Sequence, residues 1–542
     1  MIAVYATALS MFLAIALVPL LVRVARPMGL LDRPGPRKIH SNAIPRVGGI
    51  AIAVGAIVSV MVWLPFRPEI LAYAVGSMVI FLFGLLDDLF DLDFRLKLVG
   101  QTLGTVAFIM LADVYLTRMP FMFDGQIPSW LGLPFTVFAI VGVTNAINLS
   151  DGMDGLAGGT SLLAACALGY LAFLGGDNQI ALLALAVIGA TLGFLRYNTF
   201  PARVFMGDAG SQFLGFSVAA LALLIIERSN TAISPLAPLL LLALPIIDTL
   251  KVIVLRLRAG VSPFAPDRRH LHHRLLDVGL SQHQAVVLIY GLQVLLIGLT
   301  WILIYERDYI LLAVFAGFAL LLQLLIGRWQ HRHKQGGKLL MALRNVEPII
   351  KYIRENHVLA RIGARGVVFG VSLLFLTLAF TVEHINQDVG LLSFAMLVLL
   401  ALALWPKSPL PQRGISRLAS FVCAVMLVYL ASSSGLEFDF APALLMAYLL
   451  ALVVFIALWM RFGSSPGFQL NTLDVLVIVF VAVVPNLQLI QQTGLGPVML
   501  KSLLLFYACE MIVSQRPKYS QHFQFAVMGT LAILATRSVF AY

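Results

Sequence analysis

The sequence predicts an all-α polytopic integral membrane protein, because its composition is strongly apolar and long apolar runs recur along it. Of its 542 residues, 60% are hydrophobic and 12% are charged, and the mean hydropathy is +0.95. This is far more apolar than a soluble globular domain. The runs are about 17 to 25 residues long, enough to cross about 30 Å of hydrocarbon as helices. We expect about eleven transmembrane helices in a catalytic block and about seven in a C-terminal extension.

In chain order, the sequence divides into three parts. Residues 1–330 hold the first eleven runs and nearly all polar motifs. The first run, "MIAVYATALSMFLAIALVPLL", has no basic segment before it and no small-residue cleavage site, so we expect a retained first span. Residues 331–366 are basic and amphipathic, which predicts a cytoplasmic linker lying on anionic headgroups. Residues 367–542 form a transmembrane extension of unknown function, in which polar residues are isolated and lack catalytic spacing.

The distribution of basic residues predicts the orientation in the membrane. When the loops of the first eleven spans are numbered alternately, one set carries 25 Lys or Arg residues and the opposite set carries four. Cytoplasmic loops carry the excess of positive charge, so the first set is predicted to be cytoplasmic and the N-terminus outside. The net charge of +11 therefore reflects topology and does not indicate nucleic-acid binding. Three cysteines lie in apolar segments and are expected to be buried and unreactive: Cys166, Cys423 and Cys509.

The motif "GLLDD" ends an apolar run with two adjacent carboxylates, Asp87 and Asp88. Acidic residues at a membrane interface cost free energy, so their presence there suggests a function. Neighbouring helical positions point about 100° apart, which suits different tasks, such as one carboxylate toward a metal and one toward a second substrate. The alternative is an ordinary helix end with solvated charges.

The motif "FMGDAGS" places Asp208 in a glycine-flanked turn that leads into an apolar helix. The N-terminus of such a helix offers free N–H groups and a positive dipole end to phosphate oxygens, and the carboxylate beside them suits Mg²⁺. The alternative is a plain helix N-cap. No G-x-x-x-x-G-K-[ST] motif is present, so this is not a Walker A loop.

The motif "DRRHLHH" brings His270, His272 and His273 together with two arginines. The spacing does not match a zinc site, since no cysteine lies nearby and no H-E-x-x-H pair is present. Arginines and imidazoles on one loop suit an anionic, phosphate-bearing ligand. The alternative is a solvated, charged cytoplasmic loop.

The stretch "NAINLSDGMDGLAGG" adds Asp151 and Asp154, which are three positions apart and can share one helical face. Its glycines would let a nucleotide approach the backbone closely. Together with the three preceding motifs it places five carboxylates and a basic loop on one membrane face. Carboxylates that hold Mg²⁺, with cations that neutralise phosphoryl oxygens, predict a Mg²⁺–diphosphate site for one water-soluble and one lipid substrate.

Four motifs, "GLLDD", "NLSDGMDGLAGG", "NTFPARVFMGDAGSQFLGF" and "PDRRHLHHRLLD", resemble those of the polyprenyl-phosphate N-acetylhexosamine-1-phosphate transferases. The resemblance covers residues 1 to about 330 and is typical of enzymes with eleven spans. It implies transfer of N-acetylhexosamine 1-phosphate from a UDP-sugar to undecaprenyl phosphate, with release of UMP. It also implies Mg²⁺ as cofactor, with Mn²⁺ as an alternative, and a bacterial inner membrane with the active site on the cytoplasmic face. The product would start a lipid-linked cell-surface glycan, such as the O-antigen of lipopolysaccharide or a cell-wall polymer. A homodimer is an open alternative to a monomer.

The resemblance also implies a role for individual residues. The residues it places in catalysis are Asp87, Asp88, Asp208 and Lys97, with Asp208 and Asp88 as metal ligands. The residues it places at the substrates are Asn148, Asp151, Asp154, Asn198, Phe205, His270, His272 and His273. Among these, Phe205 would pack on the uracil, Asn198 would contact the nucleoside or support the site, and the histidines would contact the sugar diphosphate.

Two departures from the peptidoglycan branch of the family bear on the sugar. That branch takes UDP-MurNAc-pentapeptide and has a different first-loop motif and three consecutive histidines, whereas this chain reads "IPRVGG" and "HLHH". Both differences favour UDP-GlcNAc or a related simple UDP-HexNAc, with the peptidoglycan reaction as the alternative. An ion-coupled transporter is the alternative from another class, but the acids gather at one face and no repeated half is present.

The chemistry of the acceptor predicts that Asp87 is not required as a base. A phosphomonoester has a second pKa of about 6, so near neutral pH it is mostly a dianion already. We therefore expect the acidic pair to act mainly through Mg²⁺ and positioning. A covalent aspartyl-phosphate intermediate is the alternative to direct transfer.

Overall fold

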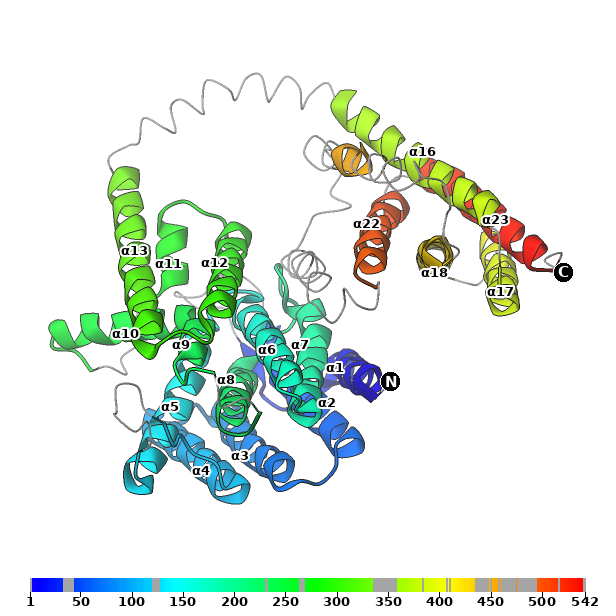
Figure 1. The fold of residues 1–542 in the computed structure, drawn as a ribbon. Helices are drawn as coiled ribbons and strands as arrows, with labels where there is room; N and C mark the ends of the chain where they lie inside the picture. Colours follow the sequence, from blue (N-terminus) through cyan, green and yellow to red (C-terminus); the bar gives the residue numbers. More distant parts are fainter. Residues whose placement is uncertain are drawn as a thin grey trace. The chain divides into compact units, whose positions relative to one another are not determined.

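The computed structural model consists of α-helices with one minimal sheet, which confirms the predicted all-α membrane protein (Figure 1). It describes residues 2–32, 43–118, 127–229, 233–262, 269–334, 358–382, 385–405, 411–433, 495–514 and 517–539, with short pieces between 408 and 474. In this part of the chain, 12 helices are long and apolar enough to cross a membrane. Most of the predicted linker, residues 335–357, lies outside the described residues.

The chain separates into two compact units. The first comprises Met1–Gly336 with Asn471–Leu476, and the second comprises Gly337–Leu470 with Val477–Tyr542. Nine of the 12 candidate spans lie in the first unit and three lie in the second. Two further helices of the first unit, Gly48–Trp63 and Ala243–Arg258, have 16 residues each and are shorter than a typical span.

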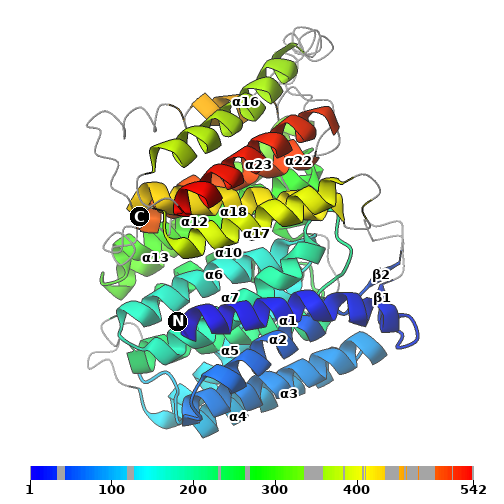
Figure 2. The same cartoon turned by 90° about the vertical axis from the view of Figure 1, so that its right-hand side faces the viewer.

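The elements of the first unit, in chain order, are α1 (Ile2–Ala25), β1 (Leu31–Asp32), β2 (Ile44–Pro45), α2 (Gly48–Trp63), α3 (Pro68–Phe90), α4 (Phe94–Ala112), α5 (Ser129–Ser150), α6 (Leu156–Leu174), α7 (Asn178–Asn198), α8 (Gly207–Leu224), the π-helical turn η1 (Ile225–Ser229), α9 (Ala237–Leu241), α10 (Ala243–Arg258), α11 (Leu271–Asp277), α12 (Gln282–Leu303) and α13 (Asp308–Lys334). The two strands pair antiparallel, with Leu31 opposite Pro45. Figure 2 shows α1, α3, α4, α6 and α7 as long helices that run beside one another.

Helix α8 is the centre of the first unit. It contacts α2, α3, α5, α6 and α7, which surround it in Figure 1. Its side chains from Ala209 to Leu224 are all buried, and they are small or apolar along most of its length. Because α8 buries this apolar surface on all sides, it is held in place by the helices packed around it. Its N-terminal end, with Asp208, meets the ends of the surrounding helices.

The second unit contains α16 (Val358–Thr381), α17 (Gln387–Leu404), α18 (Gln412–Ser433), α22 (Leu495–Ser514) and α23 (Pro517–Val539). These helices share an apolar core that includes Phe375 and Phe523. Cys423 and Cys509 are free and buried in this core, and Cys166 of the first unit is free and half-buried. Two of the three thiols therefore have the predicted burial.

Candidate active site

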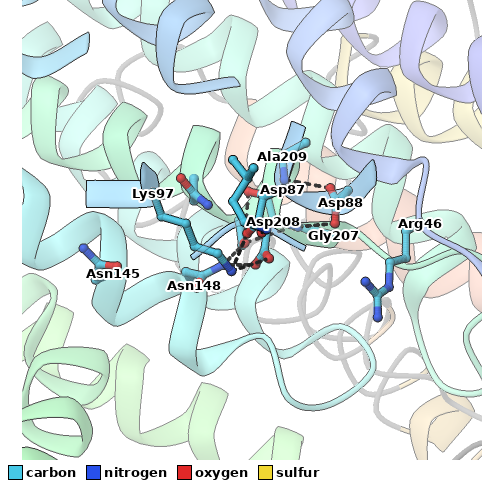
Figure 3. A network of polar contacts seen from close by, with 12 residues as sticks. Arg46, Asp87, Asp88, Lys97, Asn145, Asn148, Gly207, Asp208 and Ala209 are labelled. Carbon is cyan, nitrogen blue, oxygen red and sulfur yellow. Dashed lines mark hydrogen bonds and ion pairs between the residues drawn. The ribbon is translucent and has the colours of Figure 1, made fainter. Parts of the chain in front are cut away.

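Four helix ends bring the predicted catalytic residues of the first unit together (Figure 3). Asp87 and Asp88 come from the end of α3, and Lys97 comes from the first turn of α4. Asn148 lies near the end of α5, and Asp208 is the second residue of α8. Each helix is long, apolar and packed, so its polar end is held in place by the burial of the rest. The convergence is therefore a property of the helix bundle and not of one loop.

Asp88 caps the N-terminus of α8. Its Oδ1 accepts a hydrogen bond from the backbone N–H of Asp208 at 2.9 Å, and its Oδ2 accepts one from Ala209 at 2.9 Å. A carboxylate is favoured at this position by the helix dipole as well as by the free donors. The sequence suggested these N–H groups for phosphate oxygens, but two of them are already occupied by Asp88. The predicted role of Asp88 as a metal ligand stays a prediction.

Gly207 is necessary for this cap. Its φ is +72°, in the left-handed region, and a Cβ at this position would lie 2.5 Å from Asp88 Oδ2. Such a distance is shorter than van der Waals contact, so any side chain would displace the carboxylate. The glycine therefore allows the end of α3 to lie directly against the start of α8.

Lys97 joins the other two aspartates. Its Nζ lies 2.5 Å from Asp87 Oδ2 and 3.5 Å from Asp208 Oδ2. Asn148 Nδ2 donates to Asp208 Oδ1 at 2.5 Å and to Ser211 Oγ at 2.8 Å. Asp87 Oδ1 accepts from the backbone N–H of Leu92 at 2.9 Å. Two carboxylate oxygens from different helices thus converge on one cation, with an amide fixing the orientation of Asp208.

This donor set fits Mg²⁺ in the company of a phosphate. Mg²⁺ prefers oxygen ligands and is commonly held by one or two carboxylates, with water and substrate phosphates completing its coordination. Asp87 Oδ2 and Asp208 Oδ2 already point to one cationic position. Among the residues that the structure describes, no three His, Cys, Asp or Glu side chains are arranged to hold a metal by themselves. The arrangement is therefore suited to a metal that arrives with its phosphate ligand.

The stretch from Asp151 to Gly155 is a loop, so the predicted sharing of one helical face by Asp151 and Asp154 is wrong. Helix α5 ends at Ser150 and α6 begins at Leu156, after Gly155 with a φ of +78°. In this loop Asp154 Oδ2 accepts from the backbone N–H of Ala202 at 2.8 Å. Glycine and aspartate side chains favour this break over a continuous helix.

Asn198 connects the loop at Gly155 to the segment that leads to α8. Its Oδ1 accepts from Gly155 N–H at 3.0 Å, and its Nδ2 donates to Val204 O at 2.9 Å. Asn198 is buried, so these bonds give it the supporting position that was one of its two predicted roles. A direct contact with a nucleoside stays a prediction.

Asp151 lies beside the acidic cluster. Removal from water, followed by the negative charges of Asp208, Asp88 and Asp154, raises its pKa to about 7. A carboxyl with this pKa is protonated in a substantial fraction of molecules near neutral pH. A cation that enters the cluster would favour the ionised form of Asp151.

The start of α11, which carries the three histidines, reaches the Asp151–Gly155 loop through His272. A Cβ on Gly152 would lie 2.3 Å from His272 Nε2, which means that the imidazole occupies the space left by the missing side chain. His272 also packs on His273, with ring centroids 4.2 Å apart, and on His270 at 5.8 Å. Burial, followed by the neighbouring imidazoles, lowers the pKa of His272 to about 3. His272 is therefore uncharged at neutral pH and does not supply the positive charge that the motif suggested.

Asp248 of α10 orients His270, and the sequence did not single it out. Asp248 Oδ2 lies 2.8 Å from His270 Nδ1, and its Oδ1 accepts from the backbone N–H of Leu271 at 2.6 Å. Both side chains are buried. The stretch "PIIDTLK" placed a single acid on a helix whose other charged residues are basic, which was the available signal. Asp267 and Arg268, part of the same motif, lie outside the described residues.

The first loop is attached to the segment that carries Phe205. The backbone N–H of Phe205 donates to Pro45 O at 2.8 Å, and Gly48 N–H donates to Phe205 O at 2.9 Å. The side chain of Phe205 is half-buried, and its role at the uracil stays a prediction. These bonds tie the start of α2 to the turn before α8.

Arg46 is a second cation near the cluster that had no predicted role. Its guanidinium is paired with Asp32 across the hairpin, and Figure 3 shows it on the side of the aspartates opposite Lys97. The carboxylates of Asp88 and Asp208 are close enough to act on its charge. The signal in the sequence was one arginine among several in a basic loop, which did not distinguish it.

Comparison with known proteins gives the context of these residues. Residues 70–226 match the model of glycosyl transferase family 4. Over 290 residues the chain is 39% identical to a Bacillus subtilis (strain 168) protein named "Probable undecaprenyl-phosphate N-acetylglucosaminyl 1-phosphate transferase", across 53% of this chain and 81% of that protein. Over 277 residues it is 34% identical to the Escherichia coli O157:H7 "Undecaprenyl-phosphate alpha-N-acetylglucosaminyl 1-phosphate transferase", across 49% of this chain and 74% of that protein. A Salmonella typhi protein of the same name is 34% identical over 290 residues, across 52% of this chain and 78% of that protein.

Proposed function

Because the chain belongs to glycosyl transferase family 4 and is therefore a membrane phosphosugar transferase, we propose that it transfers N-acetylglucosamine 1-phosphate from UDP-GlcNAc to undecaprenyl phosphate and releases UMP. The observation that carries this proposal is the convergence of Asp87, Lys97, Asn148 and Asp208 from four helix ends. This set can bind, orient and neutralise phosphate groups at the end of a membrane helix bundle.

In the proposed reaction, an oxygen of the lipid phosphate attacks the sugar-bearing phosphorus of the UDP-sugar. The bond from that phosphorus to the bridging oxygen breaks, and UMP leaves with the electron pair. Catalysis of such a transfer depends on positioning and on neutralisation of negative charge. Lys97 is placed to stabilise charge on the phosphoryl oxygens, since its ammonium is already oriented by Asp87 and Asp208.

We propose Asp208 and Asp87 as the side chains that hold Mg²⁺, with Mn²⁺ as the alternative ion. Both present an oxygen to the position that Lys97 Nζ occupies in this structure, so an ion held there would displace the ammonium toward the phosphoryl oxygens. Both oxygens of Asp88, by contrast, already accept backbone hydrogen bonds. When bound, the ion would neutralise charge on the diphosphate. In this proposal Asp88 does not contact the ion. It positions Asp208 by accepting hydrogen bonds from the first turn of α8.

The nucleotide is proposed to lie against the Asp151–Gly155 loop and Phe205. The start of α11 would cover the nucleotide from the side opposite Phe205, because His272 already packs over Gly152. The motifs "IPRVGG" and "HLHH" favour a simple UDP-HexNAc over UDP-MurNAc-pentapeptide. We further propose a bacterial inner membrane location with the N-terminus outside and the site on the cytoplasmic face, where the product would start a lipid-linked surface glycan.

Exchange of labelled UMP into UDP-GlcNAc tests the function. Purified protein should catalyse exchange that depends on both undecaprenyl phosphate and Mg²⁺. Asp208→Asn should abolish it, and Asp388→Asn, a variant in the second unit, should not. An ion-coupled transporter would give no exchange, and exchange only with UDP-MurNAc-pentapeptide would indicate the peptidoglycan reaction.

A further inference from the structure

We infer that Arg46 is a phosphate-binding residue of the transferase site and that Asp32 is its positioning residue. The ligand is a phosphate group of one of the two substrates, either the diphosphate of the sugar nucleotide or the monophosphate of the lipid. This inference rests on the proposed function and extends it to a residue that the family motifs discussed above do not assign.

The backbone around Arg46 belongs to the site. Arg46 N–H donates to Leu30 O at 2.9 Å, which continues the pairing of β1 with β2. The preceding residue, Pro45, accepts the N–H of Phe205 at 2.8 Å, and Gly49 N–H donates to Met206 O at 2.8 Å. Arg46 is thus attached on both sides to the segment that ends in Asp208. The position of Arg46 relative to Asp208 is therefore fixed, so a ligand at the acidic cluster would find Arg46 at a constant distance.

The side chain of Arg46 pairs with a buried carboxylate and is itself partly exposed to solvent. Asp32 has a side-chain exposure of 8%, and Arg46 has one of 35%. The Asp32 contact uses Nη2 of the guanidinium, which carries five N–H donors in a planar fork. A buried carboxylate that orients a partly exposed guanidinium leaves donors directed to an incoming anion. Planar, bidentate geometry of this kind matches phosphate oxygens.

The charges around the cluster call for a second cation. Lys97 is engaged by Asp87 and Asp208, and Arg46 lies on the other side of these carboxylates (Figure 3). The reaction brings two phosphate-bearing substrates into contact, so negative charge approaches the cluster from two directions. A cation on each side of the cluster would attract both phosphate-bearing substrates. A single lysine between two aspartates does not provide positive charge on both sides.

Steady-state kinetics with each substrate varied in turn test this inference. Arg46→Gln should raise the KM of one substrate by about tenfold or more, because a hydrogen bond to a charged group is lost. The KM of the other substrate should change by less than about twofold. The substrate affected identifies the source of the phosphate: UDP-GlcNAc indicates the diphosphate, and undecaprenyl phosphate indicates the lipid.

Two variants separate a ligand contact from a structural effect. Arg46→Lys keeps the charge without the fork and should restore part of the affinity for the same substrate. Asp32→Asn keeps Arg46 but releases it, and should raise the same KM by a smaller factor. Arg67→Gln, at an exposed arginine before α3, is the matched control and should leave both KM values unchanged.

Three results would overturn the inference. The first is active Arg46→Gln enzyme with both KM values unchanged, and the second is an equal loss of kcat for both substrates with no change in KM. The third is a wild-type protein that transfers no sugar phosphate and is not stabilised thermally by either substrate. Only this third result also removes the proposed function, so the two failures are distinguishable.

Discussion

The Asp88 carboxylate lies 2.9 Å from the backbone nitrogen of Asp208, although the two residues are 120 positions apart. This contact joins the end of α3 to the start of α8 and explains why two features of the sequence, an acidic pair and a glycine-flanked aspartate, occur together. It also separates the tasks of the adjacent acids. Asp87 faces Lys97, and Asp88 fixes the turn that presents Asp208.

Gly207→Ala should reduce kcat by about tenfold or more, although it removes no charged or ligating group. A Cβ would lie 2.5 Å from Asp88 Oδ2 and the backbone φ of +72° disfavours a side chain. The cap of α8 would then be displaced. Gly142→Ala is the matched control, since no atom lies within 4 Å of a Cβ added there. Wild-type activity of Gly207→Ala in the exchange assay would contradict this role of Asp88.

Asp87→Asn should retain a low activity whose pH dependence parallels that of the wild type. The acceptor phosphate has a second pKa of about 6 and is mostly dianionic near neutral pH, so no base is needed to ionise it. The measurement is the pH–rate profile of the variant between about pH 6 and pH 9. Asp91→Asn, at an exposed aspartate after α3, is the control. A residual rate that climbs steeply with pH would mean that Asp87 serves as a base.

Asp151→Asn should stabilise the protein without Mg²⁺ or substrate, and more so at higher pH. The folded pKa of Asp151 is raised to about 7 from its ordinary value of 3.8, so folding favours its protonated form. Its contribution to stability is therefore present below pH 3.8 and is lost as the pH rises toward 7. The gain from the variant should grow over this range and level off above it.

Thermal unfolding in detergent with a chelator, compared between about pH 5 and pH 8, measures this gain. Asp113→Asn is the control, because Asp113 is exposed in a loop after α4. An equal gain at all pH values would show that Asp151 is not protonated in the folded protein.

Asp248→Asn should lower kcat about tenfold or more through His270. The variant keeps an oxygen for the Leu271 N–H but removes the negative charge beside His270 Nδ1. Because the two residues act as one unit, the double variant with His270→Gln should be no worse than the more damaging single variant. Asp277→Asn, at the exposed end of α11, is the control. Multiplicative losses in the double variant would place Asp248 in a separate structural role.

The sequence predicted the helices well, because an apolar run of sufficient length in a membrane has few alternatives to a helix. It also predicted that Asp87 and Asp208 lie at one membrane face, since each adjoins such a run, and the family resemblance added Lys97 and Asn148 to the same site. Local spacing, however, did not predict the loop at Asp151. The space left by one of its glycines, Gly152, is filled by His272 of a distant helix, and local spacing does not specify this contact.

Contacts between distant segments account for what the sequence left out. The pairing of Asp248 with His270 depends on how α10 packs, and no local pattern specifies it. The neutral state of His272 follows from its burial. The sequence did not predict this burial, because a motif with several basic residues suggests an exposed, charged segment. Arg46 is distinguished by its pairing with Asp32 of the facing strand, a contact that the sequence of the loop does not specify.

The central claim is most directly tested by measuring which product the purified protein forms from undecaprenyl phosphate and each of three donors. The donors are UDP-GlcNAc, UDP-GalNAc and UDP-MurNAc-pentapeptide, and the products are resolved by mass spectrometry in the presence of Mg²⁺. The proposed reaction predicts undecaprenyl diphosphate carrying GlcNAc, equimolar UMP, and no product with Asp208→Asn. Formation of UDP instead of UMP, or equal product from the Asp208→Asn variant, would contradict it.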